Sequence, residues 1–125
     1  MTSDTTAAAF QEQLQALRTS YAQEIPRKLQ AIDTLSQFLL TQRWSDADAQ
    51  TLRRMAHTLA GSSATFGFAM VSSVARQIEQ CVAAILECAA APTEEQRADL
   101  GDALGVLRRI TPEAAAPAPS IVRLT

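Results

Sequence analysis

Hydrophobic residues recur along most of the chain at the spacing of helices that pack on one face. Between residues 7 and 22 they stand at i, i+4, i+7 and i+11, as Phe10, Leu14, Leu17 and Tyr21. This is the repeat of an amphipathic helix. No run of alternating β-branched residues, which would indicate a strand, interrupts the pattern. The chain is therefore predicted to be all-α.

A second helix is predicted to follow at Pro26. Proline disfavours helical geometry at the residue before it and suits the first turn of a new helix. A kink or break is expected there, with the next helix reaching about Gln42. Its inner stripe consists of Leu29, Ile32, Leu35 and Leu39.

The third helix is predicted from about Asp46 to about Phe66. Ser45 with Asp48 three residues later has the form of a capping box. Gly67 suits the left-handed conformation that commonly follows a helix. The short connection to the next helix then requires an antiparallel hairpin.

The last two helices are predicted from their inner apolar stripes and from the capping residues between them. One is predicted from about Phe68 to Ala90, and the other from about Thr93 to Arg109, with Thr93 and Gln96 as a second capping box. Pro112 is expected to end the last helix. The inward positions are Val71, Val74, Ile78, Val82, Ile85 and Ala89 in the first, and Leu100, Ala103, Leu104 and Leu107 in the second.

These elements predict an antiparallel four-helix bundle, up-down-up-down, with an additional N-terminal helix. Residues 1–6 are polar and expected to be flexible, and residues 7–111 form the bundle. Residues 112–125, rich in proline and alanine, are expected to be a flexible tail.

Composition narrows the possible functions. The chain of 125 residues is 47% hydrophobic, enough for one domain with its own core. Its net charge of −2 gives no basic field for nucleic acid, and no apolar run is long enough to span a membrane. Cys81 and Cys88 lie too far apart on one helix for a disulfide. We expect a cytoplasmic protein with reduced cysteines and no signal peptide.

One residue with distinctive chemistry lies in the helix predicted over residues 46–66: His57, the only histidine. At about 100° per residue it falls opposite the apolar stripe and among small side chains. Gly61 costs up to about 1 kcal/mol relative to alanine in a helix interior. Its place one turn beyond the ring suggests that it clears a path for another molecule. The stripe consists of Leu52, Met55, Leu59, Ser62 and Phe66, and the small side chains are Ala60, Gly61 and Ala64.

The residues around His57 resemble the histidine phosphotransfer (HPt) domain family. The family pattern His-x-Leu-Lys-Gly-Ser-(Ser/Ala), followed by a glycine, corresponds to residues 57–63 and Gly67. One helix later the family has Leu-x-x-x-Ala-x-x-Leu-Glu, which is filled here by Val71, Ala75, Ile78 and Glu79. The resemblance covers most of residues 7–110. One departure stands out, since the family's usual lysine is Ala60 here.

This resemblance implies a phosphoryl carrier of a two-component phosphorelay rather than an enzyme. His57 would exchange a phosphoryl group with receiver-domain aspartates through Nε2, and Glu79 would orient the ring through Nδ1–H. The implied partners are a response-regulator receiver domain, which would bring Mg²⁺, and a sensor or hybrid histidine kinase. No cofactor is expected on this chain, which is expected to be a monomer.

Basic residues near His57 offer a replacement for the missing lysine. Arg53 and Arg54 lie about one turn before the ring, where they could meet phosphoryl oxygens through charge-assisted hydrogen bonds. A solvated basic patch explains them equally well. Arg76, on the following helix, is a further candidate for the surface on which a partner docks, together with Ala60, Gly61 and Ala64.

Two alternatives to the phosphorelay carrier stay open. The histidine could be phosphorylated directly by a chemotaxis-type kinase, or the bundle could be an interaction module with an incidental histidine. The sequence gives little support for an enzymatic function. A catalytic triad needs a base, a nucleophile and an orienting group, and only His57 could be the base. A zinc site needs about four ligands, which one histidine and two remote cysteines do not supply. No glycine-rich phosphate loop is present.

Overall fold

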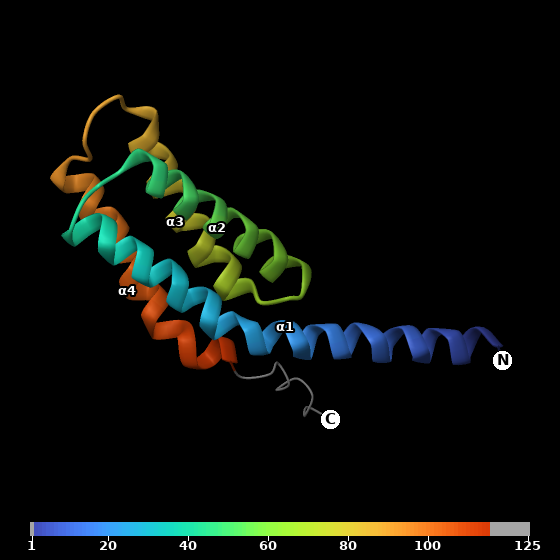
Figure 1. Cartoon of the computed structure of the whole chain (residues 1–125). Coiled ribbons are helices and arrows are strands. Elements are labelled where there is room, and N and C mark those ends of the chain that lie inside the picture. Colours follow the sequence, from blue (N-terminus) through green and yellow to red (C-terminus); the bar gives the residue numbers. More distant parts are fainter. Residues whose placement is uncertain (1, 116–125) are drawn as a thin grey trace.

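The chain forms four helices joined by short connections (Figure 1). The structure is a computed structural model that describes the backbone of residues 2–115 and the side chains of residues 6–110. The helices are α1 (Thr2–Thr41), α2 (Asp46–Thr65), α3 (Ala69–Glu87) and α4 (Glu94–Ala115). Within these limits no strand is present, so the all-α prediction is confirmed.

The helices pack in a closed ring in which α1 contacts α2, α2 contacts α3, α3 contacts α4 and α4 contacts α1. Figure 1 shows the chain reversing its direction at each connection. Most of the predicted inward positions from residue 25 onward form one continuous core, and its largest fully buried side chains come from all four helices. They include Ile25, Leu29, Ile32, Leu39, Leu52, Ile78, Val82, Ile85, Leu100, Leu104 and Leu107. Ala89 was also predicted to face inward, but it lies beyond the end of α3 and is exposed.

The prediction of a separate N-terminal helix is wrong, because α1 runs without interruption through Pro26. Ile25 and Leu29, on either side of the proline, are both buried in the bundle. Their packing keeps this stretch helical despite the hydrogen bond that a proline cannot donate. Figure 1 shows α1 bending where it joins the bundle, and a proline inside a helix is the ordinary cause of such a bend.

The N-terminal half of α1 projects beyond the other helices (Figure 1). Its base is fixed to the turn between α2 and α3. Arg18 Nε donates a 2.7 Å hydrogen bond to the carbonyl of Phe66, and its guanidinium lies 5.1 Å from the ring centre of Phe68. Tyr21 stacks on Phe66 with ring centres 5.0 Å apart. These contacts cap the C-terminus of α2 from a distant part of the sequence.

The predicted helix signals near the connections are confirmed. Ser45 Oγ accepts a 3.3 Å hydrogen bond from the Asp48 amide at the start of α2. Thr93 and Gln96 form a reciprocal capping box, with bonds of 2.9 and 3.0 Å. Gly67, with φ of 85°, takes the left-handed conformation after α2.

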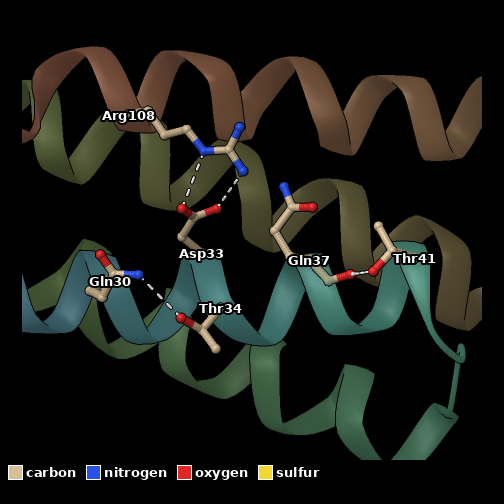
Figure 2. A network of polar contacts seen from close by, with 6 residues as sticks. All are labelled: Gln30, Asp33, Thr34, Gln37, Thr41 and Arg108. Carbon is tan, nitrogen blue, oxygen red and sulfur yellow. Dashed lines mark hydrogen bonds and ion pairs between the residues drawn. The ribbon is translucent and has the colours of Figure 1, made fainter.

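Polar contacts join α1 to α4 on the outside of the bundle (Figure 2). Arg108 donates two hydrogen bonds to the Asp33 carboxylate, at 3.2 and 2.8 Å. Hydrogen bonding to Asp33 and its negative charge raise the pKa of Arg108. Arg97 donates to the carbonyl of Leu40, which lies near the C-terminal end of α1. Both arginines therefore hold α4 along the second half of α1.

Three predicted boundaries were misplaced. Helix α1 already begins at Thr2, although residues 1–6 were expected to be flexible. Helix α3 ends at Glu87, three residues before the predicted end. Helix α4 continues to Ala115, past Pro112. The predicted tail from residue 116 onward lies outside the described residues. Among the described residues, no helix combines the length and apolar character needed to cross a lipid bilayer.

Candidate functional site

A hydrogen bond joins His57 on α2 to Glu79 on α3. The imidazole Nδ1 lies 2.8 Å from Glu79 Oε2. An ionised carboxylate only accepts hydrogen bonds, so the geometry calls for the proton on Nδ1 and leaves the lone pair on Nε2. The His57 side chain is 73% exposed while that of Glu79 is 18% exposed. Within the described residues Nε2 makes no hydrogen bond, so the ring presents its second nitrogen to solvent.

The buried stripe of α2 explains how the ring meets α3. It runs through Ala49, Leu52, Ala56, Leu59, Ala60 and Ser63. The sequence had placed the stripe through Leu52, Met55 and Phe66, with the histidine opposite. The actual stripe is rotated toward the alanines, because their small side chains let α3 approach closely. His57 therefore lies at the edge of the α2–α3 contact and not directly opposite the core.

On the α3 side the position of Glu79 is fixed by buried neighbours. Ala75 and Ile78 are fully buried, which sets the rotation of α3 about its axis. Ser72 Oγ donates a buried 2.8 Å hydrogen bond to the carbonyl of Ala60, which sets the position of α3 along α2. Ser72 was not among the predicted site residues. Its only signal in the sequence is a polar residue within the apolar stripe of a helix.

The small residues around the ring divide into two groups. Gly61 and Ala64 are exposed, and a Cβ added at Gly61 would meet no atom within 4 Å. Ala60 is only 2% exposed and belongs to the contact with α3. Its prediction as part of the docking surface is therefore wrong. The open surface beside His57 is formed by Gly61 and Ala64.

The three candidate arginines differ in their contacts and in the surface on which they lie. Arg53 Nε donates a 3.4 Å bond to Gln50 and Arg54 Nη2 a 3.3 Å bond to Thr51, so each contacts its own preceding turn and not the imidazole. Arg54 also lines a hollow of about 450 Å³ between α1 and α2, away from α3. Arg76 is exposed on α3 and lines a second hollow of about 370 Å³ that also includes Ala64.

Other reactive groups lie apart from this site. Burial, and to a lesser extent the charge of Asp99, raises the pKa of the Cys81 thiol, which keeps it protonated at neutral pH. In the part of the chain that the structure describes, no three or more His, Cys, Asp or Glu side chains are grouped to hold a metal ion. The distinctive chemistry of the site is thus one exposed, oriented imidazole.

Comparison with known families agrees with this geometry. The model of the Hpt domain family matches residues 6–110, which include all of α2 and α3 and both partners of the His57–Glu79 hydrogen bond. No curated protein and no solved structure shows a significant match to the chain. Because the family model covers most of the sequence, the chain belongs to the Hpt domain family, whose members carry phosphoryl groups in two-component signalling.

Proposed function

We propose that this protein is a phosphoryl carrier in which His57 exchanges a phosphoryl group with the aspartates of response-regulator receiver domains. The observation that supports this most strongly is the hydrogen bond from Nδ1 to Glu79, together with the free and exposed Nε2. An antiparallel bundle would serve as the rigid support that holds the two side chains in place.

The transfer is a displacement at phosphorus. The Nε2 lone pair attacks the phosphoryl group of the receiver's aspartyl phosphate, an N–P bond forms, and the bond from phosphorus to the aspartate oxygen breaks. The aspartate leaves as a carboxylate. The proton on Nδ1 stays in place, and Glu79 balances the positive charge that develops on the ring. Transfer to a second receiver reverses these steps.

The receiver supplies what this chain lacks. We propose that it brings Mg²⁺ and most of the charge stabilisation of the transferring group, as phosphoryl transfer generally requires. Here the role of the family's lysine would pass to Arg53, which lies one turn before His57 on the same side of α2. Arg54 is a weaker candidate because it lines the hollow toward α1.

The docking surface of this proposal surrounds the ring on α2 and α3. Gly61 and Ala64 leave room for the backbone of a receiver, and Arg76 would lie at the charged rim. Apolar contact at the centre and charge at the edge is the usual arrangement of a protein interface. Salt should therefore slow association more than it speeds dissociation.

The test is incubation of the full chain with a phosphorylated receiver domain, with His57→Gln as the matched variant. We expect the parent to acquire label that is lost in acid and kept in base, as a phosphoramidate should behave. The His57→Gln variant should acquire none while its helix content stays the same. Label that persists in the variant, or label that survives acid, would rule out His57 as the carrier.

A further inference from the structure

The N-terminal half of α1 carries an apolar stripe that the bundle does not cover. Phe10 is 57% exposed, Leu14 41% and Leu17 55%, so three large hydrophobic side chains face solvent along one helix. All three were predicted from sequence to belong to a packed helix face. Contiguous exposed apolar surface of this kind usually marks an interaction site.

The spacing of the stripe indicates that another helix covers it. With Ala7 included, its members stand three, four and three residues apart at Ala7, Phe10, Leu14 and Leu17. This alternation of three and four is the heptad seam through which helices pair side by side. Tyr21 continues the same spacing, but its ring already stacks on Phe66 of the α2–α3 turn. The free seam therefore ends where the bundle begins.

The charges beside the seam favour a second copy of this chain as the partner. Between residues 6 and 17 the only charged residue is Glu12. It lies on the opposite side of the helix from the midpoint of the stripe, whereas the flanking residues Gln11 and Gln13 are neutral. Two copies can therefore pair without repulsion between like charges. A membrane surface is a poor partner, because helices that lie on membranes carry basic residues beside their apolar face.

The shape of the molecule sets the orientation of the pair. At about 1.5 Å per residue α1 is about 60 Å long, whereas the other helices are about 30 Å, and its N-terminal half stands clear of the bundle (Figure 1). A parallel copy would bring its own bundle against the α2–α3 turn that Tyr21 contacts. An antiparallel copy places the two bundles at opposite ends.

We propose that this protein self-associates through an antiparallel pair of α1 segments, with Leu14 of each copy facing Phe10 of the other. The seam from Ala7 to Leu17 spans about one and a half heptads, which is less than a stable coiled coil or a standard interface provides. Association is therefore weak, reversible and dependent on concentration. The sequence-based expectation of a monomer treated these residues as part of the bundle, and the pairing replaces it.

The test is sedimentation equilibrium of the full chain over a wide range of concentration. The mean mass should rise from the 13.4 kDa of one chain toward twice that value. Leu14→Glu should raise the dissociation constant at least tenfold, whereas Gln15→Glu, which adds the same charge one residue away from the seam, should leave it unchanged. Circular dichroism would establish that both variants keep their helices.

Two results would overturn the proposal. One is a single-chain mass at every concentration, and the other is equal association by the parent and Leu14→Glu.

The orientation of the pair has its own test, in a protein in which Cys81 and Cys88 are replaced by serine. Mixed Ala7→Cys and Leu17→Cys variants should form a disulfide between unlike chains if the pair is antiparallel. A disulfide only between two Leu17→Cys chains would exclude that arrangement.

Discussion

Ser72 Oγ donates a 2.8 Å hydrogen bond to the backbone carbonyl of Ala60, and this buried contact fixes α3 against α2 just beyond His57. Glu79 lies seven residues after Ser72, about two turns along α3. The same contact therefore sets the height at which the carboxylate meets the imidazole. The position of the family's missing lysine lies inside this contact between helices and not on the open surface.

The first prediction concerns the carboxylate that orients the ring. Glu79→Ala should slow single-turnover transfer from a phosphorylated receiver several-fold, since a charge-assisted hydrogen bond at a partly exposed site is worth about 1 kcal/mol. Glu79→Gln should slow transfer less than Glu79→Ala, because its amide oxygen can still accept the hydrogen bond from Nδ1–H. Glu87→Ala, at the exposed end of the same helix, is the control and should match the parent. Equal rates for all variants would show that the ring needs no partner.

The second prediction separates access to the ring from helix stability. Gly61 and Gly101 are both exposed glycines inside helices, and a Cβ at either would meet no atom within 4 Å. Replacing either one by glutamine should raise the free energy of unfolding by about 0.5 kcal/mol. Only Gly61→Gln should block transfer, because only that side chain would stand beside His57. If both variants transfer like the parent, the receiver does not approach over Gly61.

The third prediction ranks the contributions of Arg53 and Arg54 to transfer and tests the effect of a lysine at residue 60. Arg53→Ala should slow transfer a few-fold, corresponding to about 1 kcal/mol, and Arg54→Ala should have a smaller effect. Ala60→Lys should lower the free energy of unfolding by about 1–3 kcal/mol, because the new side chain enters a packed contact. Chemical denaturation and single-turnover kinetics on the same samples would measure both effects. A stable Ala60→Lys variant that transfers much faster than the parent would contradict this ranking.

The fourth prediction follows from the burial of Cys81. Burial raises its pKa, so the protonated thiol is favoured in the folded protein, and this stabilisation is present at neutral pH and lost as the pH rises above about 9. The thiolate is the reactive form, so Cys81 should react with a thiol reagent at pH 8 more slowly than the exposed Cys88. Mass spectrometry of digested samples would give both rates. Faster labelling of Cys81 would exclude this burial in solution.

Local signals predicted the connections well, because each depends on neighbouring residues. The N-cap at Ser45, the capping box at Thr93 and the left-handed Gly67 were predicted where the structure has them. A kink or a break was expected at Pro26, and the break is absent because the effect of a proline depends on tertiary packing. The burial of Ile25 and Leu29 outweighs the local tendency to break the helix.

At the site, the sequence identified the residues but not their packing. The family resemblance implied that Glu79 accepts a hydrogen bond from Nδ1–H of His57, and the structure places these two atoms 2.8 Å apart. The rotation of α2 was misjudged because large side chains were used to define its stripe. Ala56 and Ala60 form much of the actual contact, and alanine gives a weak signal in any hydrophobic pattern.

In the proposed transfer, Nε2 of His57 receives the phosphoryl group while Nδ1 keeps its proton toward Glu79. The chain has one histidine, so a ¹⁵N spectrum of imidazole nitrogens in the full chain contains one ring. On phosphorylation by a receiver, the Nε2 resonance should move and couple to ³¹P while Nδ1 stays protonated. Phosphorus coupled to Nδ1, or a ring spectrum unchanged in protein that has taken up label, would contradict it.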